Sequence, residues 1–319
     1  MKEEILAVLK EKKKYVSGQE LGDLLGVSRT YIWKQVQILR KEGCDIVARP
    51  RRGYFLTYSP DSLRQGELKP LFKGELFKGP LYYFEKTNST NVIARDLARR
   101  GTPEGTIVTA ETQVKGKGRL SRRWLSPVGG IWLSFVIYPP VSPLQVPLFT
   151  FLTAVALVEA LAEEGLETGI KWPNDVLYQG RKIAGILTEM GAEGERVSYL
   201  VIGVGINANI SLLSLTPEVR QKASSLLTIL GRPVDRPALA AAFLARFSHY
   251  YYLALEEGFD RIIKLWHRYE ITLGRKVLLQ QGDKKIEGIA SGINDSGSLI
   301  LTLPDGRQET YLAGEVTLL

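Results

Sequence analysis

Residues 113–124 of the chain read Gln-Val-Lys-Gly-Lys-Gly-Arg-Leu-Ser-Arg-Arg-Trp. Five cations lie from Lys115 to Arg123, with two glycines among them and an aromatic side chain, Trp124, at the end. Glycine lets a backbone approach a ligand closely, and Lys and Arg side chains suit phosphate or carboxylate oxygens. A charge run can equally be a solvated loop. Its position between two apolar segments, 105–110 and 131–138, predicts a basic binding loop held between two strands.

Length and composition indicate a protein of two or three domains, since the chain has 319 residues. We find no apolar run as long as a membrane span and no signal peptide. The one cysteine, Cys44, excludes an intramolecular disulfide and fits a reducing compartment, so we expect a cytoplasmic protein without a membrane partner. His249 and His267 lie in helical patterns without cysteine neighbours, so we expect no protein metal site.

The net charge of +8 is concentrated at the N-terminus. Residues 1–60 contain 12 basic and 7 acidic side chains, a net charge of +5, whereas residues 61–319 carry +3. A small basic head on a nearly neutral body suggests that the head binds a polyanion.

The first sixty residues have the pattern of a winged helix-turn-helix. Ile5, Leu6 and Leu9 have helical spacing, and Ser17 with Glu20 forms a capping box for a second helix, in which we expect 21, 24 and 25 to be buried. Ser28 caps a third helix that runs to about residue 41, and residues 46–56 form a hairpin with three arginines at its turn.

The polar outer face of the third helix and the basic hairpin predict DNA binding. A helical head that contacts another protein is the alternative. The residues that we expect to face DNA are Ser28, Arg29, Thr30, Tyr31, Lys34, Gln37, Arg51 and Arg52.

The central part alternates apolar strands with helices. A strand at 81–84 precedes Ser89, Thr90 and Asn91, which start a helix whose free N–H groups can hold polar ligand atoms, although an ordinary N-cap would look the same. A long apolar helix is expected at 148–163.

A second polar cluster follows that helix. Residues 171–175 read Lys-Trp-Pro-Asn-Asp, and Lys182 interrupts the apolar strand 180–187. A lysine in such a strand needs a ligand or a partner, and a solvent-facing position or a pair with Glu189 would also satisfy it. The strand 197–206 contains Gly203 and Gly205, which leave room for a ligand to lie across it, and it ends at Asn207.

From residue 272 the pattern changes to short strands and tight turns, typical of a small SH3-like β-barrel. We therefore predict an α+β multidomain fold. Its parts are a winged helix-turn-helix domain (1–64), a central α/β catalytic domain of the class II synthetase-like kind (65–271) and an SH3-like C-terminal domain (272–319).

These motifs together resemble the bifunctional biotin protein ligases, the biotin–[acetyl-CoA-carboxylase] ligases that also repress the biotin operon. The resemblance covers the whole chain. It implies that biotin and ATP, with Mg²⁺, are joined into biotinyl-5′-AMP, and that biotin then passes to a lysine of the biotin carboxyl carrier protein. It also implies binding to operator DNA of biotin genes as a homodimer promoted by biotinyl-5′-AMP.

The resemblance also implies roles for residues at matching positions. Lys182 and Arg119 would stabilise charge during catalysis, and Asp175 would orient or deprotonate the incoming amine. The biotin-binding residues would be Ser89, Thr90, Asn91, Gln113, Lys117, Gly118, Arg119 and Lys182. The nucleotide-binding residues would be Arg122, Trp124, which would stack on adenine, and Asn207.

The loop departs from the commonest family pattern at two positions. Position 117 is Lys in place of Arg, and position 121 is Ser in place of Gly. Lys offers a point charge instead of a bidentate fork, and a residue other than glycine stiffens the loop. Both changes affect how tightly the intermediate is expected to be held.

Other functions remain as alternatives. An octanoyltransferase of this fold needs a cysteine nucleophile, whereas Cys44 lies in the head; lipoate ligases usually lack such a head. A repressor with an inactive ligase core would be expected to lose Lys182 or Arg119, and both are present. A ligase whose head no longer controls DNA is the remaining alternative.

Overall fold

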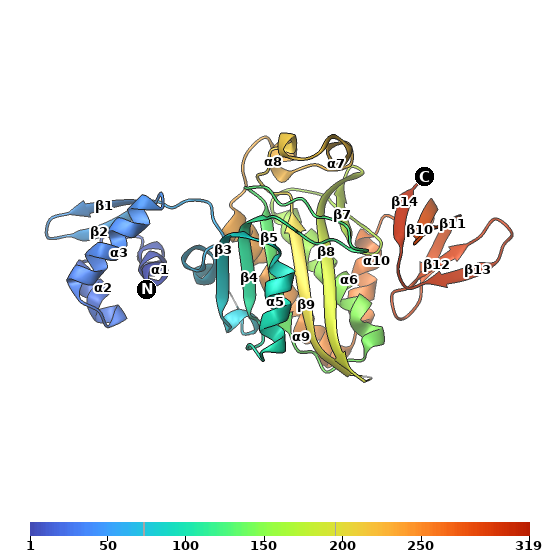
Figure 1. Cartoon of the computed structure of the whole chain (residues 1–319), viewed down its shortest axis with the longest axis horizontal. Helices are drawn as coiled ribbons and strands as arrows, with labels where there is room; N and C mark the ends of the chain where they lie inside the picture. Colours follow the sequence, from blue (N-terminus) through green and yellow to red (C-terminus); the bar gives the residue numbers. More distant parts are fainter. Residues whose placement is uncertain (73, 195) are drawn as a thin grey trace.

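The computed structural model describes residues 1–72, 74–194 and 196–319, arranged in three parts along one long axis (Figure 1). A small helical head lies at one end, a mixed sheet flanked by helices forms the centre, and an antiparallel β domain lies at the other end.

The head consists of three helices and a hairpin, as the sequence predicts. The Ser17 hydroxyl accepts the Glu20 N–H at 3.0 Å and the Ser28 hydroxyl accepts the Tyr31 N–H at 3.2 Å, so both helices have an N-cap bond. The predicted capping box is only half formed, because the Glu20 carboxylate lies 3.9 Å from Lys12 instead of bonding back to Ser17. The head has its own apolar core, which includes the buried Cys44. Its elements are α1 (Lys2–Lys12), α2 (Gly18–Leu25), α3 (Arg29–Lys41), β1 (Asp45–Arg49) and β2 (Gly53–Tyr58).

One predicted core position of the head is wrong. Leu24 is 59% exposed, whereas Leu21 is buried and Leu25 packs against the core. The buried face of α2 follows Gly18, Leu21 and Gly22, with Leu25 half-buried beside it, and each residue turns the helix by about 100°. Leu24 therefore lies beside this face instead of on it.

The central sheet has seven strands in the order β3-β4-β5-β9-β8-β7-β6. β3 and β4 are parallel, and the other neighbouring pairs are antiparallel. The strands are β3 (Leu81–Thr87), β4 (Ile107–Gln113), β5 (Ile131–Ile137), β6 (Gly169–Lys171), β7 (Asp175–Tyr178), β8 (Arg181–Glu193) and β9 (Arg196–Ile206).

Helices cover both faces of this sheet, and one face carries the larger core (Figure 1). α6 and α9 pack together on one face, while α5 covers the other through Ala94 and Ala98. The α-helices of the central part are α4 (Gln65–Leu68), α5 (Thr90–Arg99), α6 (Val146–Glu163), α7 (Pro217–Lys222), α8 (Leu226–Leu230), α9 (Arg236–Glu257) and α10 (Asp260–Tyr269). Short 3-10 turns are η1 (Lys69–Leu71), η2 (Leu76–Lys78), η3 (Pro143–Gln145) and η4 (Leu212–Ser214).

The helical segment Pro143–Glu163 is long and apolar enough to cross a membrane, by length and composition alone. Our expectation that no apolar run reaches that length was therefore wrong. The apolar residues of α6 instead face neighbouring helices and strands, and 67% of its most apolar window is buried within the fold. A helix that is apolar on all sides is also what the centre of a large core requires.

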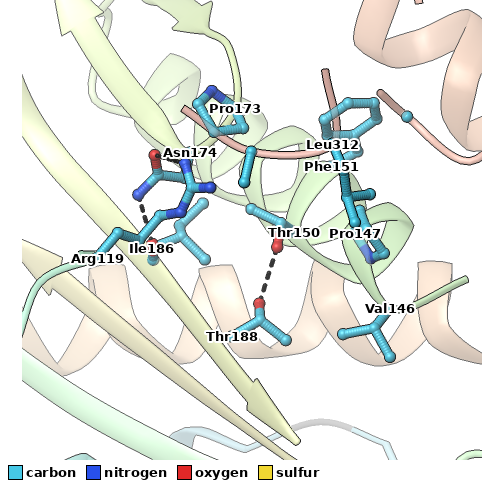
Figure 2. A pocket seen from close by; sticks show the side chains of 12 residues that line it. Arg119, Val146, Pro147, Thr150, Phe151, Pro173, Asn174, Ile186, Thr188 and Leu312 are labelled. Carbon is cyan, nitrogen blue, oxygen red and sulfur yellow. Dashed lines mark hydrogen bonds between the residues drawn. The ribbon is translucent and has the colours of Figure 1, made fainter. Parts of the chain in front are cut away.

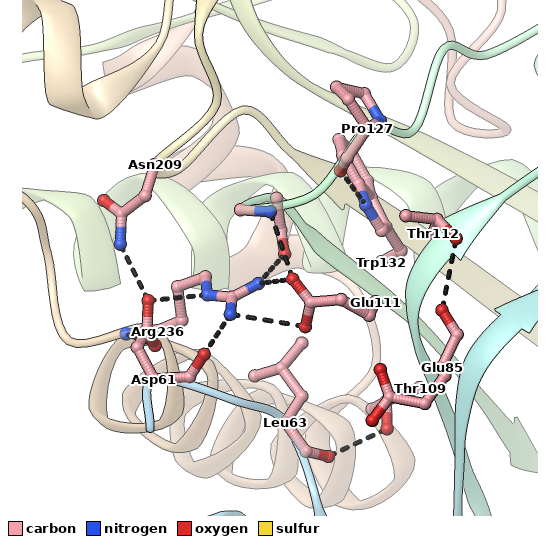
Figure 3. Close-up of polar contacts among 12 residues, drawn as sticks. Asp61, Leu63, Glu85, Thr109, Glu111, Thr112, Pro127, Trp132, Asn209 and Arg236 are labelled. Carbon is pink, nitrogen blue, oxygen red and sulfur yellow. Dashed lines mark hydrogen bonds and ion pairs between the residues drawn. The ribbon is translucent and has the colours of Figure 1, made fainter. Parts of the chain in front are cut away.

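The linker after the head is built into the central part through Arg236. This side chain is 4% exposed; its Nε donates to Asp61 Oδ2 at 2.7 Å and its Nη1 to Glu111 Oε1 at 3.0 Å (Figure 3). Thr109 Oγ1 also donates to the Leu63 carbonyl at 2.9 Å. A buried guanidinium is stable only with such partners, so these contacts fix the path of the chain as it leaves the head.

Further ion pairs join the head to the central part. Lys10 of α1 pairs with Glu67 of α4, whose side chain is buried. Arg64 pairs with Glu42 of the head at 2.9 Å and with Glu85 of β3 at 2.6 Å. The head is thus held against the linker at more than one point.

The C-terminal domain is a five-stranded antiparallel sheet in the order β13-β12-β11-β10-β14. Four strands match the segments that the sequence predicts, 277–279, 287–293, 299–301 and 309–312, and the fifth, at the chain end, was not predicted. The strands are β10 (Lys276–Gln281), β11 (Lys284–Ile293), β12 (Leu299–Thr302), β13 (Gln308–Tyr311) and β14 (Glu315–Leu318).

Candidate functional site

Polar side chains from distant segments meet at one edge of the central sheet. β3 and β4 are parallel and pair Thr87 with Gln113, so the chain segments that follow these strands lie side by side. The Thr90 N–H donates to Gln113 Oε1 at 2.8 Å, and Gln113 Nε2 donates to Ser126 Oγ at 2.8 Å. The start of α5 is thereby joined to both ends of the basic loop.

Ser89, Thr90 and Asn91 are all buried at the start of α5. Ser89 occupies the N-cap position without a side-chain capping bond, so an ordinary cap does not account for its hydroxyl. Asn91 donates from Nδ2 to Glu189 Oε2 at 2.8 Å. The three residues therefore form a polar cluster inside the fold.

The two strand glycines make room for protein side chains, and not for a ligand lying across the strand as we expected. A Cβ atom at Gly203 would lie 1.9 Å from Asn91 Oδ1, and one at Gly205 would lie 2.6 Å from Trp124 Nε1. Asn91 and Trp124 thus lie against β9 only because these positions lack side chains.

Lys182 forms an ion pair with Asp175, with Nζ and Oδ1 2.5 Å apart, so the alternative pairing with Glu189 is wrong. Lys171 lies 3.1 Å from the other oxygen of Asp175. Burial alone would raise the pKa of Asp175, but the charges and hydrogen bonds of the two lysines hold it below its usual value. Asp175 is therefore a weak base that holds two cations.

The aromatic side chain at the end of the basic loop is part of the same cluster. Lys182 Nζ lies 4.9 Å from the centre of the Trp124 ring, within the range of a cation–π contact. Trp124 Nε1 is buried without a hydrogen-bond partner in the described part of the chain. Asn207 Nδ2 donates to the Ser224 carbonyl at 3.0 Å, so the NH₂ group of this side chain is bonded within the fold.

The basic loop is folded back on itself. The Trp124 N–H donates to the Gly116 carbonyl and the Gly118 N–H donates to the Arg122 carbonyl, both at 2.8 Å. At the tip, Leu120 and Ser121 have φ angles of 52° and 59°, in the left-handed region that favours glycine. Lys117 is exposed, and the hollow formed by residues 114–117 and 121–123 measures about 470 Å³.

Two arginines of the loop contact the C-terminal domain. Arg122 pairs with Glu315 at the start of β14. Arg119 Nη1 lies 3.3 Å from Asn174 Oδ1 and 3.4 Å from the Gly314 carbonyl oxygen. Burial lowers the pKa of Arg119, and the charge of Asp175 opposes this effect.

Arg119 also lines a cavity of about 210 Å³ between α6, β8 and the C-terminal domain (Figure 2). The Thr150–Thr188 hydrogen bond of 2.9 Å crosses it, and Asn174 lies beside Arg119. The cavity is smaller than an ordinary ligand pocket. Arg119 and Asn174 belong to its lining and connect it to the polar cluster.

In the head, the residues expected to face DNA lie on an exposed surface of α3 and on the hairpin turn, except Gln37, which is half-buried. Arg29, Thr30 and Lys34 are exposed, Tyr31 is 39% exposed, and Arg51 and Arg52 lie at the turn. The hydroxyl of Ser28 already accepts the cap bond of α3. Trp33, 53% exposed on α3, was not anticipated.

Two residues in contact with this polar cluster were missed, namely Ser134, which contacts Thr90 and Asn91, and Glu315, which contacts the loop. Glu189 and Lys171 were named from the sequence, but without their contacts to Asn91 and Asp175. Ser134 carried a usable signal, because it is the one polar residue in the apolar run 131–137. Nothing in the sequence indicated a role for Glu315, because its partner, Arg122, lies 193 positions away.

Comparisons with known proteins agree with this architecture. The family model "Biotin/lipoate A/B protein ligase family" matches residues 83–207, "HTH domain" matches 2–55 and "Biotin protein ligase C terminal domain" matches 272–319. The bifunctional ligase/repressor BirA of Bacillus subtilis is 38% identical over 94% of this chain and 93% of its own. The chain belongs to the bifunctional biotin protein ligase and repressor family.

More distant members agree with this assignment. BirA of Escherichia coli is 32% identical over 95% of this chain and 92% of its own. The structure of biotin protein ligase from Aquifex aeolicus in complex with biotin and ATP is 30% identical, with a TM-score of 0.64, and covers 75% of this chain and 98% of that chain. The chain thus has both the ligase core and the helix-turn-helix head of the bifunctional family.

Proposed function

We propose that this ligase–repressor activates biotin with ATP, transfers it to a lysine of a biotin carboxyl carrier protein, and represses biotin genes by binding operator DNA. The observation that carries the proposal is the convergence of the start of α5, the basic loop, Trp124 and Lys182 at one sheet edge in a member of this family.

The first step joins two anions, so cations must offset their repulsion. A carboxylate oxygen of biotin attacks the α-phosphorus of ATP and displaces pyrophosphate, which leaves a mixed anhydride. Lys182 and Arg119 would stabilise the negative charge that builds on the carboxyl and phosphate oxygens. Arg122, Trp124 and Asn207 would hold the nucleotide, with Trp124 stacked on adenine.

Biotin itself would be held at the start of α5 and by the loop. The residues assigned to this role are Ser89, Thr90, Asn91, Gln113, Lys117, Gly118, Arg119 and Lys182. Closure of the loop over the mixed anhydride would exclude water, which would otherwise hydrolyse it.

The second step is attack by the carrier's lysine nitrogen on the acyl carbon, which releases AMP and a proton. We assign Asp175 to orienting the incoming ammonium group. A carboxylate whose pKa is held below its usual value is a good partner for a cation and a poor proton acceptor.

Mg²⁺ would enter with ATP. Among the described residues there is no group of three or more Asp, Glu, His or Cys side chains that could hold a metal ion. Magnesium is commonly bound by substrate phosphates with one or two protein carboxylates, so the triphosphate would supply most of its ligands.

Repression would use the exposed face of α3 and the hairpin, with Ser28, Arg29, Thr30, Tyr31, Lys34, Arg51 and Arg52 at the DNA. We propose a cytoplasmic homodimer, promoted by biotinyl-5′-AMP, because one head offers few contacts. We place the domain boundaries after residues 64 and 271.

The test is incubation of the full chain with biotin, ATP, Mg²⁺ and a biotin carrier domain, followed by mass spectrometry of the carrier. We expect a mass increase equal to one biotinyl group, only when ATP is present. An unmodified carrier would contradict the ligase assignment. A modified carrier without binding to any biotin-gene promoter would leave a ligase with an uncoupled head.

A further inference from the structure

A continuous chain of hydrogen bonds runs beneath the start of α5. It begins at the Arg95–Glu189 ion pair, where Nη1 and Oε1 are 3.4 Å apart, and it ends at Gln113. Between these ends lie Asn91, Ser134 and Thr90, which are 4%, 0% and 3% exposed. Because solvent scarcely reaches these groups, each proton in the chain must be assigned to a protein partner.

Glu189 fixes the orientation of the Asn91 amide. Asn91 Nδ2 lies 2.8 Å from Glu189 Oε2 and 3.4 Å from the Leu187 carbonyl oxygen. An ionised carboxylate and a carbonyl can only accept hydrogen bonds. The NH₂ end of Asn91 must therefore face them, which turns Oδ1 toward Ser134.

The orientation of the Asn91 amide determines which atom receives the hydroxyl proton of Ser134. Its Oγ lies 2.6 Å from Asn91 Oδ1 and 2.7 Å from Thr90 Oγ1. Asn91 Oδ1 can only accept, so the single hydroxyl proton of Ser134 belongs to that bond. Thr90 must then donate its own hydroxyl proton to Ser134.

Thr90 and Gln113 consequently present acceptor oxygens. The Thr90 hydroxyl proton is used on Ser134, and its N–H is used on Gln113 Oε1 at 2.8 Å. The same hydroxyl proton is not available for the 3.2 Å contact between Thr90 Oγ1 and Gln113 Oε1. These two oxygens retain lone pairs, and a ligand that supplies an N–H donor would satisfy them.

We propose that Glu189 and Ser134 are positioning residues that set the polarity of the biotin head-group pocket. Through Asn91 they make Thr90 an acceptor, so that Thr90 and Gln113 select a ureido N–H of biotin. The inference rests on the proposed biotin ligase function and adds to it a residue on β8 that controls head-group specificity from beneath the pocket.

The test compares biotin with cyclic carbamate analogues in which a ring oxygen replaces one ureido N–H. The replaced N–H is tested at both positions, and kcat and KM are measured for biotinyl-AMP formation. We expect the parent protein to lose roughly tenfold or more in kcat/KM with one of the two analogues, since a buried acceptor is left unpaired.

Glu189→Gln keeps the shape of the side chain but offers both an oxygen and an NH₂ group to Asn91. The amide can then reverse, and Thr90 is no longer fixed as an acceptor. We expect the preference for biotin over that carbamate to shrink by roughly tenfold and the KM for biotin to rise, with the KM for ATP within about twofold of the parent. We expect Ser134→Ala to show the same loss of preference and the same rise in the KM for biotin.

Glu193→Gln is the matched control, because Glu193 is an exposed carboxylate on the same strand. Parent-like preference in Glu189→Gln and Ser134→Ala, or equal losses in KM for biotin and ATP, would overturn the inference. A parent protein that forms no biotinyl-AMP would instead contradict the proposed function. Thermal unfolding of each variant shows whether a loss reflects the fold.

Discussion

Lys182 gains its significance from the residues around it. The side chain is 32% exposed, lies 2.5 Å from Asp175 and lies over the Trp124 ring. An ion pair alone would make it structural, but the ring that it faces belongs to the end of the basic loop. The position therefore suits a cation that holds acceptor oxygens between the loop and β8.

We expect Lys182→Ala to reduce biotinyl-AMP formation by roughly 100-fold or more, because one charge-stabilising donor is worth about 3–4 kcal/mol in comparable sites. The measurement is pyrophosphate release with biotin and ATP. Arg181→Ala removes the neighbouring, exposed cation and should retain parent activity. If Lys182→Ala turned over at the parent rate, the lysine would have only a structural role.

Asp175 predicts a dependence of stability on pH. Its folded-state pKa is held below the ordinary value of 3.8, so its ion pairs contribute stability that is fully present above that pH. The contribution is lost as pH falls through the lower folded-state pKa. The carboxylate should thus stay ionised throughout the neutral range.

Asp175→Asn should lower the free energy of unfolding at pH 7 by about 1.5–3 kcal/mol, the usual worth of hydrogen bonds to a charged group. The difference from the parent should narrow below pH 3.8. Denaturant unfolding from pH 7 downward measures both effects, with the exposed Asp295→Asn as control. A constant difference at every pH would argue against ionisation as its cause.

At the scale of helices and strands, the sequence predicted the elements whose formation depends on residues that are close together in the chain. The helices of the head follow from the caps at Ser17 and Ser28 and from apolar spacing, and these features need no knowledge of the rest of the chain. Leu24 was misassigned because two neighbouring faces of a short helix satisfy the same spacing. β14 was missed because its apolar residues are few and its pairing partner, β10, begins far upstream.

The candidate site was predictable as a set of residues but not as a geometry. Its motifs identified Lys182 and Asp175 separately, whereas their ion pair depends on the register of β7 with β8. Glu189 was considered only as a partner for Lys182, because nothing in the sequence shows that Asn91 lies over Gly203. Contacts of this kind follow from sheet packing.

Side-chain contacts join the basic loop to the C-terminal domain. Arg122 is paired with Glu315 and Arg119 with the Gly314 carbonyl, so a phosphate that binds these arginines must replace protein acceptors. Glu315 thus holds the loop against β14.

Limited trypsin digestion tests this contact, because trypsin can cleave after the several lysines and arginines of the loop. Glu315→Gln should raise the cleavage rate in the loop of the free protein by up to about fivefold, as expected for a partly exposed pair worth about 0.2–1 kcal/mol. Biotin with ATP should protect the parent and the variant alike. Glu287→Gln, an exposed position on β11, is the control, and equal cleavage of all three free proteins would exclude the tether.

At the scale of the whole molecule, ion pairs fix the head against the linker and the central part. Lys10 and Arg64 pair with linker and head carboxylates, and Arg236 holds Asp61 within the central part. Two such molecules in a dimer would present their heads at a set spacing. Two recognition helices need half-sites one helical turn, about 34–36 Å, or a multiple of that distance apart.

We expect ligand binding and DNA binding to be coupled through the dimer. If loop ordering on biotinyl-AMP creates part of the dimer surface, operator affinity and adenylate affinity must rise by the same factor. Carrier domain without biotin consumes the adenylate, and it should therefore lower operator affinity. We expect tight binding to the biotin-gene promoter with biotin plus ATP, weak binding without them, and intermediate binding after carrier is added.

A DNA-binding titration under these three conditions measures the coupling, and a carrier whose acceptor lysine is changed to arginine serves as control. That carrier cannot consume adenylate, so any loss of DNA binding that it causes reports competition for the dimer surface. An Arg51→Ala, Arg52→Ala double variant should weaken DNA binding in every condition and leave biotin transfer unchanged, because both arginines lie at the hairpin turn, far in the fold from the ligase site. Identical operator affinity in all three conditions would mean that head and ligase core act independently.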